Sequence, residues 1–143
     1  MSFLLDTNVI SESAKPRPDP GVMAWLGSAA ESELFLSVIS LAELRHSVER
    51  LADGQRKKAL NLWLTEQLPE RFDDRLLTID AETADRWGRV VARAQAVGRP
   101  IGAMDGFLAA IAEQHKLTLV TRNASDFDGA GVRVFNPWAT RDA

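Results

Sequence analysis

The sequence contains no cysteine and only two histidines among its 143 residues. The absence of cysteine excludes disulfides and thiolate metal sites, which suits a reducing compartment such as the cytoplasm. No apolar run approaches the length of a membrane span. Asp6 interrupts the one apolar stretch near the N-terminus, so a signal peptide is not expected there either. We therefore expect a cytoplasmic protein that makes no contact with a membrane.

Positive charge is also scarce, because 17 lysines and arginines stand against 20 aspartates and glutamates and leave a net charge of −3. Nucleic-acid-binding faces are usually strongly basic, so a broad face of that kind is disfavoured. A nuclease is still compatible with this charge, since a pocket of carboxylates lowers the net charge while bound cations reverse its local sign. The length predicts one domain that spans residues 1–143.

Apolar runs that alternate with helical patterns predict an α/β fold. The runs predict strands at residues 3–5, 34–38, 76–79 and 117–121, and a shorter edge strand at 132–135. Helical spacing of apolar residues predicts helices at 20–30, 41–51, 59–68, 81–97 and 103–115. This alternation is typical of a mainly parallel central sheet of four to five strands that is flanked by helices on both faces.

Four acidic residues stand where a predicted strand or helix reaches one edge of this sheet, namely Asp6, Glu43, Asp105 and Asp126. Three of them also have structural interpretations. Ser40 and Glu43 have the spacing of a capping box at a helix start. Asp105 falls in the first turn of a helix, where the macrodipole favours an acid, and Asp126 suits a turn. Ligands of open α/β sheets bind outside the carboxyl ends of the strands, however, and four carboxylates brought together there repel unless a cation neutralises them. The sequence therefore predicts a metal site.

The ligand atoms available at this edge are all oxygens. Mg²⁺ and Mn²⁺ prefer oxygen ligands, and Mg²⁺ usually binds few carboxylates together with substrate phosphates. His46 follows Glu43 at the spacing seen in di-iron bundles, but the second copy that those sites need is missing. The pattern thus predicts a Mg²⁺ or Mn²⁺ site for phosphate chemistry. Hydrogen bonds that orient its carboxylates are expected from Thr7, Asn8, Thr121 and Asn123.

Five segments resemble the motifs of PIN-domain proteins. They are Phe3–Glu12 (FLLDTNVISE), Ile39–Leu44 (ISLAEL), Asp105–Ala112 (DGFLAAIA), Leu119–Asn123 (LVTRN) with Asp126 and Phe127, and Phe135–Trp138 (FNPW). Their order along the chain matches the family pattern, and five motifs in sequence are far more specific than any one of them. Among PIN-domain proteins, the chain looks most like the VapC toxins of bacterial type II toxin–antitoxin systems, particularly the FitB-like branch.

The resemblance implies a Mg²⁺- or Mn²⁺-dependent endoribonuclease toxin that a VapB-like antitoxin silences by inserting a segment into the acidic pocket. It further implies an RNA substrate, a homodimer, and contact with DNA only through the antitoxin. Many relatives carry one more acid just before the third motif, where this chain has Gly102 and Ala103, so the number of metal ions stays open. The family's core acids map onto Asp6, Glu43, Asp105 and Asp126, and its polar positions map onto Thr7, Asn8, Thr121 and Asn123.

The antitoxin should bind through more than the acids alone. A basic side chain can neutralise the same carboxylates that a metal ion does, and an arginine can pair with two of them at once. A single charge pair does not sustain tight association, however. We therefore expect an apolar partner surface that is built from the predicted helices at 20–30 and 41–51.

Other classes of protein explain the acids less well. A haloacid-dehalogenase-like phosphatase needs a second aspartate two positions after the first, where this chain has Asn8. A phospho-accepting receiver domain needs a second acid beside Asp6 and a lysine after the late strand, where Arg122 stands. A non-catalytic alternative stays open, in which the acids form a docking pocket for a DNA-binding antitoxin. RNA cleavage by the purified chain without its partner distinguishes this alternative from an enzyme.

Overall fold

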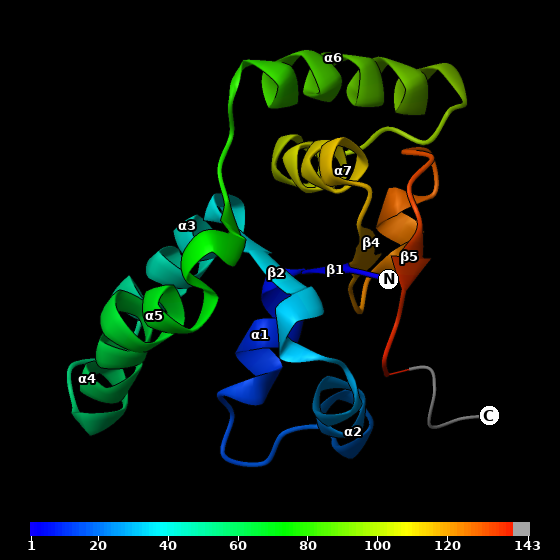
Figure 1. Cartoon of the computed structure of the whole chain (residues 1–143). Coiled ribbons are helices and arrows are strands. Elements are labelled where there is room, and N and C mark those ends of the chain that lie inside the picture. Colours follow the sequence, from blue (N-terminus) through cyan, green and yellow to red (C-terminus); the bar gives the residue numbers. More distant parts are fainter. Residues whose placement is uncertain (139–143) are drawn as a thin grey trace.

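The computed structural model of the chain, which describes residues 1–138, has a parallel sheet at its centre (Figure 1). Its strands are β1 (Phe3–Leu5), β2 (Leu34–Ser37), β3 (Leu76–Leu77), β4 (Thr118–Val120) and β5 (Val134–Phe135). They lie in the order β3-β2-β1-β4-β5, and every neighbouring pair is parallel. The predicted α/β fold with a parallel sheet is confirmed, and β5 is an edge strand as predicted.

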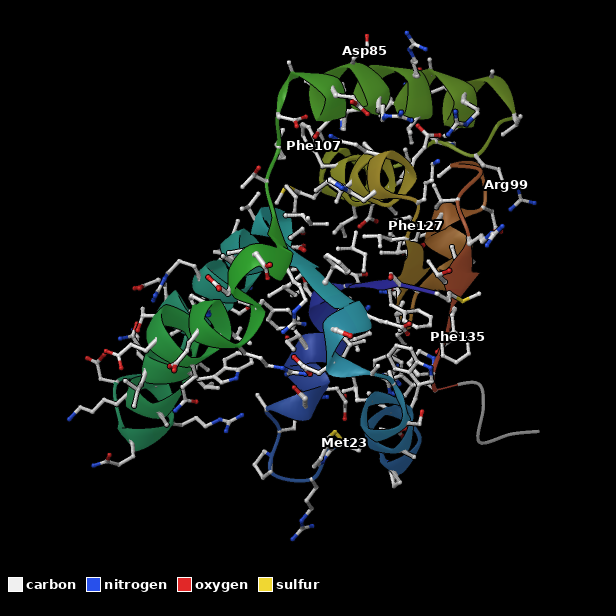
Figure 2. All side chains as sticks on the ribbon, viewed as in Figure 1. Met23, Asp85, Arg99, Phe107, Phe127 and Phe135 are labelled. Atoms are coloured by element: carbon white, nitrogen blue, oxygen red, sulfur yellow. The ribbon has the colours of Figure 1, made fainter. Side chains whose placement is uncertain are left out.

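The strands divide their side chains between two apolar cores, one on each face of the sheet. Consecutive residues of a strand point to opposite faces. Leu5 and Val120 accordingly belong to one core, whereas Leu4 and Leu119 belong to the other. All four are fully buried. Figure 2 shows side chains filling the space between the sheet and the helices on either side. The central strand is buried on both faces, which is why its sequence is an uninterrupted apolar run.

Helices from the first half of the chain cover the first core. They are α1 (Thr7–Ser13), α2 (Pro20–Ser28), α3 (Val38–Glu49), α4 (Gln55–Leu62), a π-helical turn (Trp63–Gln67) and α5 (Leu68–Phe72), with 3-10 turns at Glu31–Glu33 and Asp73–Arg75. The sequence pattern does not predict α1. The helix predicted at 41–51 begins three residues earlier, at Val38, and the one predicted at 59–68 is the middle of a longer helical stretch over 55–72.

The second core is covered by α6 (Ala81–Ala96), α7 (Ala103–His115) and a 3-10 turn, η4 (Ala124–Phe127). α7 lies between α6 and the sheet (Figure 1). A Cβ atom at Gly106 would come within 2.8 Å of the indole nitrogen of Trp87, so glycine lets the two helices approach closely. The same nitrogen donates a hydrogen bond to the Ala103 carbonyl at 3.0 Å. This packing fixes the first turn of α7, which carries Asp105.

The order of the strands decides where the polar motifs meet. β1 is the central strand, and its neighbours β2 and β4 are parallel to it, so their carboxyl ends share one edge of the sheet. A single residue separates β1 from α1, and α3 follows β2 without any connection. The first turns of both helices therefore lie at this edge. None of the helices within residues 1–138 has the length and apolar content that crossing a membrane requires.

Candidate active site

Asp6 lies at the carboxyl end of the central strand, where the chain turns from β1 into α1. It is only 7% exposed, and its N–H donates to the Val120 carbonyl at 2.9 Å. Its Oδ1 accepts a hydrogen bond from the Thr7 N–H at 2.7 Å and caps α1. Its Oδ2 accepts from the Thr121 hydroxyl at 2.8 Å. The two carboxylate oxygens are thus held by different segments, the first turn of α1 and the residue that follows β4, which fixes the orientation of the charge.

The buried hydroxyl of Thr121 connects three segments of the chain. It donates to Asp6, and its oxygen accepts from the side-chain amide of Asn8 at 3.3 Å and from the Asn123 N–H at 3.1 Å. Asn8 in turn accepts from the Arg122 N–H at 3.3 Å. These hydrogen bonds join α1 to the loop after β4. Thr121 is therefore hydrogen-bonded directly to Asp6. Asn8 and Asn123 bond to Thr121 and so influence the position of Asp6 only indirectly.

Glu43 reaches the same site from α3. Its Oε1 accepts a hydrogen bond from the Thr7 hydroxyl at 2.6 Å, and the Thr7 oxygen also lies 3.1 Å from Ser40 Oγ. The predicted capping box of Ser40 and Glu43 is wrong. The cap of α3 is Ser37, whose hydroxyl oxygen accepts from the Ser40 N–H at 3.3 Å. Because the helix begins at Val38, Glu43 lies in its second turn and is too far along to serve the cap.

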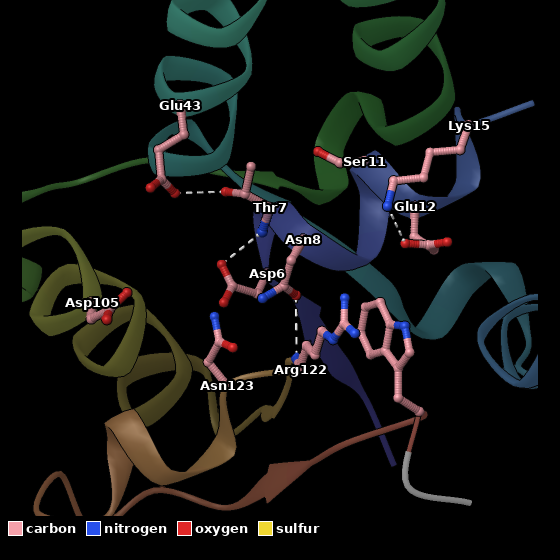
Figure 3. Close-up of a pocket in the computed structure, with 11 residues that line it drawn as sticks. Asp6, Thr7, Asn8, Ser11, Glu12, Lys15, Glu43, Asp105, Arg122 and Asn123 are labelled. Carbon is pink, nitrogen blue, oxygen red and sulfur yellow. Dashed lines mark hydrogen bonds and ion pairs between the residues drawn. The ribbon is translucent and has the colours of Figure 1, made fainter. Parts of the chain in front are cut away.

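The four predicted acids are divided between two adjoining cavities. Asp6, Glu43 and Asp105 line the first, which has a volume of about 370 Å³ (Figure 3). Asp105 also lines the second, of about 320 Å³, together with Asp126 from η4. Asp105 is partly exposed and Asp126 is exposed. The structure thus brings three of the acids into one cavity and places the fourth in the adjoining cavity. Asp105 lines both cavities.

The first cavity has further lining residues that the sequence patterns did not single out as site residues. Some of them follow Asn8 at the helical spacing i, i+3, i+4 and i+7, the last of which lies just beyond the end of α1, and this periodicity is the signal that points to them. Glu12 is buried and accepts hydrogen bonds from Lys15 Nζ at 2.9 Å and from the Asp19 N–H at 2.8 Å. The lysine's hydrogen bond, above all, lowers the pKa of the Glu12 carboxyl. The full set of additional residues is Ser11, Glu12, Lys15, Arg122 and Trp138.

Comparison with known proteins identifies the family of this chain. The family model named PIN domain matches residues 3–131. The chain belongs to the PIN-domain family. It is 42% identical to Toxin FitB of Neisseria gonorrhoeae over 136 residues, which cover 95% of this chain and 98% of that protein. It is 36% identical to VapC ribonuclease Y4jK of Sinorhizobium fredii over 136 residues, or 95% of this chain and 97% of that protein. A solved structure of FitAB bound to an IR36 DNA fragment matches with a TM-score of 0.90 and 40% identity over 95% of each chain. The resemblance inferred from the motifs is confirmed.

Crowding of the carboxylates in this PIN domain changes their acidity. The pKa of Asp105 is raised to about 6, chiefly by burial and then by the charges of the other three acids. Burial also raises the pKa of Asp6, although hydrogen bonds from Thr121 and Thr7 oppose the increase. The charges of Glu43 and Asp126 raise it further. Asp126 therefore interacts electrostatically with the acids of the first cavity, and the two cavities form one acidic site.

This set of side chains fits a hard divalent cation. All of its ligand atoms are oxygens, and positive charge would relieve the repulsion that contributes to the raised pKa of Asp6 and Asp105. Within residues 1–138, no group of three acidic, histidine or cysteine side chains is arranged to enclose a metal ion by itself. Mg²⁺ does not require a closed cage, since it keeps several waters and is usually bound by one or two carboxylates and substrate phosphates. Asp6, Glu43 and Asp105 are the residues that would hold it.

We expect the metal-free PIN domain to lose stability as the pH rises from 3.8, the ordinary pKa of an aspartate, to about 6, the pKa of Asp105 in the folded protein. Because this pKa is raised, the folded chain binds the proton more tightly than the unfolded chain, and that contribution disappears through this interval. Asp105→Asn should remove this contribution and so weaken the dependence, whereas the contribution from the raised pKa of Asp6 has the same sign and remains. At pH 7 the variant should be more stable than the parent by about 1 kcal/mol, since water partly screens this carboxylate.

Urea unfolding in the presence of EDTA at several pH values measures this effect. Asp85→Asn is the control, because Asp85 is 65% exposed on α6 and pairs only with its neighbour Arg89 in the ion pairs of the described chain. This variant should keep the pH dependence of the parent. An Asp105→Asn protein that is less stable than the parent at pH 7 would show that the carboxylate is not repelled in the folded state.

Proposed function

We propose that this PIN domain is the endoribonuclease toxin of a VapBC-type toxin–antitoxin system, dependent on Mg²⁺ or Mn²⁺ and inhibited by a cognate VapB-like antitoxin. One observation carries the proposal: Asp6, Glu43 and Asp105 line a single cavity at the carboxyl end of the sheet. Carboxylates gathered in this way favour a divalent cation and hence phosphate chemistry. The names of the relatives, a toxin and a ribonuclease, support the choice of RNA as substrate.

The side chains around the cavity have separate tasks in this proposal. A Mg²⁺ or Mn²⁺ ion, when bound, would polarise a phosphate and make a water molecule more acidic. The carboxylates of Asp6, Glu43 and Asp105 would supply the negative charge that holds such an ion at the sheet edge. Thr121 and Thr7 fix the directions of the Asp6 and Glu43 carboxylates through bonds of 2.8 Å and 2.6 Å. Asp126 adds negative charge from the second cavity.

The charge distribution is compatible with an RNA substrate in spite of the net charge of −3. When ionised, the four acids of the site carry more negative charge than the whole chain does, so the remainder of the chain is slightly basic. Bound cations reverse the sign at the site itself. Because specific recognition of RNA mostly involves unpaired bases, we expect the target to be a single-stranded segment or a loop.

An apolar groove beside the acidic cavity suits an antitoxin segment. It is lined by Leu44, Val48 and Leu51 from the region of α3, and by Leu60 and Trp63 across from them. The groove shares two lining residues, Ser11 and Lys15, with the acidic cavity. An amphipathic segment in the groove could therefore extend a basic side chain toward the carboxylates. The predicted partner surface at 41–51 lies along this groove, whereas residues 20–30 do not line it.

In the proposed toxin–antitoxin assembly, the antitoxin is the protein that contacts DNA. The solved FitAB structure contains a DNA fragment. By analogy, we propose that this chain meets DNA only through its antitoxin and forms a homodimer. The shortage of positive charge agrees with this division of tasks, because a chain with a net charge of −3 is poorly suited to bind a DNA duplex directly.

Incubation of the purified, partner-free chain with RNA tests the proposal. We expect specific fragments when Mg²⁺ or Mn²⁺ is added and intact RNA when EDTA is added instead. Sequencing of RNA ends after induced expression in cells would identify the target in the same experiment. The non-catalytic alternative predicts a different outcome, in which the chain binds its antitoxin but leaves RNA intact with either metal. That result would refute the nuclease proposal.

A further inference from the structure

We infer that Arg122 is a phosphate-binding residue of this site and that the indole of Trp138 holds its guanidinium in place. This inference rests on the proposed function, because the phosphate belongs to the RNA substrate. It adds a binding residue that the acidic motifs do not predict. The two side chains line the same cavity as Asp6, Glu43 and Asp105.

The first observation is that Arg122 is the cation of the first cavity that forms no ion pair with an acid of residues 1–138. Two cationic side chains line the cavity, Lys15 and Arg122. Lys15 is paired with the buried Glu12 at 2.9 Å. Among the ion pairs of residues 1–138, none involves the Arg122 guanidinium, although carboxylates surround the cavity. A positive charge left in this state is available to an anion from outside the chain.

The second observation is that the position of Arg122 is fixed at both its backbone and its side chain. Its N–H donates to Asn8 Oδ1 at 3.3 Å, the bond drawn in Figure 3, and its carbonyl accepts from Asn136 Nδ2 at 3.2 Å. The guanidinium carbon lies 5.3 Å from the centre of the Trp138 ring. Asn136 also accepts a hydrogen bond from the Trp138 N–H at 2.9 Å. Asn136 thus connects the backbone of Arg122 to the backbone of Trp138, the residue whose ring lies next to the guanidinium.

The contact with Trp138 is compatible with phosphate binding. The guanidinium carbon lies over the indole ring, and this cation–π contact occupies none of the N–H donors of the arginine. They can form two parallel hydrogen bonds to phosphate oxygens, which lysine cannot reproduce. A phosphate that approaches four carboxylates needs a positive group close by. The guanidinium supplies that charge at a fixed place on the rim of the cavity.

The inference is tested by RNA cleavage kinetics with four variants of the whole chain. Arg122→Ala should reduce kcat/KM roughly 10- to 100-fold, mainly through KM, because a charge-assisted pair of hydrogen bonds is lost. Arg122→Lys should recover only part of this loss. Trp138→Leu should weaken RNA binding as well, since the guanidinium loses its support. Arg89→Ala is the control, because this arginine is 75% exposed on α6 and should not affect cleavage.

RNA binding in an inactive Asp6→Asn background provides a second measurement. Adding Arg122→Ala should reduce the slope of log affinity against log salt by about 0.7, the value for one phosphate contact on a single strand. Arg89→Ala should leave the slope unchanged. If the parent cleaves RNA and Arg122→Ala matches it in both KM and salt slope, the inference is wrong while the nuclease proposal stands. If the parent does not cleave RNA at all, the proposed function fails instead.

Discussion

Asp6→Asn is expected to abolish RNA cleavage and growth inhibition while the fold stays intact. The change keeps the shape of the side chain but removes the negative charge that a divalent cation needs, so we expect a loss of roughly 100-fold or more in cleavage rate. The asparagine can keep the hydrogen bond from the Thr7 N–H, which is made at 2.7 Å in the parent. Removing a buried carboxylate whose pKa is raised also lowers the electrostatic cost of folding at neutral pH.

Cleavage assays with equal amounts of parent and variant, together with thermal unfolding, measure both parts of this prediction. Asp85→Asn is again the matched control, because it makes the same chemical change at an exposed position on α6. It should leave cleavage at the level of the parent. An Asp6→Asn protein that cleaves RNA at nearly the parental rate would eliminate the proposed site, whatever its stability.

Glu43→Gln is expected to cause a similarly large loss of cleavage. The structure leaves one non-catalytic role for this side chain, which is to accept the hydrogen bond from the Thr7 hydroxyl at 2.6 Å. Glutamine has a carbonyl oxygen that can accept the same bond, so a purely structural role predicts almost no change. A role in holding a cation predicts a loss of roughly 100-fold, since the neutral amide is a much weaker ligand. The two interpretations therefore give different rates for one substitution.

Thr7→Val is the complementary variant, because it removes the hydrogen bond to Glu43 and leaves every charge in place. We expect it to lower cleavage about 10-fold, through a less well oriented carboxylate. Thermal unfolding of both variants separates loss of function from loss of fold. Retained cleavage by Glu43→Gln at an unchanged melting temperature would leave Glu43 with a structural role only.

Elements buried on both faces were the most predictable parts of this fold. Residues 3–5 form a short, entirely apolar run. A run this short can bury all of its side chains in a strand whose sheet is covered on both faces. The parallel order then follows from the helices between the strands, and with it the gathering of acids at one edge. Asp6 and Glu43 could be placed for this reason, since each comes directly from the segment that ends or follows a strand.

The features that the sequence did not predict are local ones, such as a short helix, the choice of a cap residue and the packing of a turn. α1 has seven residues, too few for a clear apolar period, and Asp6 serves both as its cap and as a site residue. Ser37 and Ser40 are both suitable caps for α3, and only the tertiary structure selects the first. Near Pro69, which has no N–H to donate, the helical stretch over 55–72 makes a π-helical turn at Trp63–Gln67. The separation of Asp126 into a second cavity likewise depends on how η4 packs against α7.

The sheet order has a consequence for when the activity can arise during protein synthesis. β1 is synthesised before the other strands of the sheet, but one of its two partners, β4, comes from residues 118–120, more than 100 residues later. A growing chain that stops before Thr121 contains Asp6, Glu43 and Asp105 and yet lacks the hydroxyl that orients Asp6. Ribosomes add residues from the N-terminus onward, so the acidic site cannot be completed before Thr121 has been added. A fragment released before that point would therefore carry three of the acids without the group that orients Asp6.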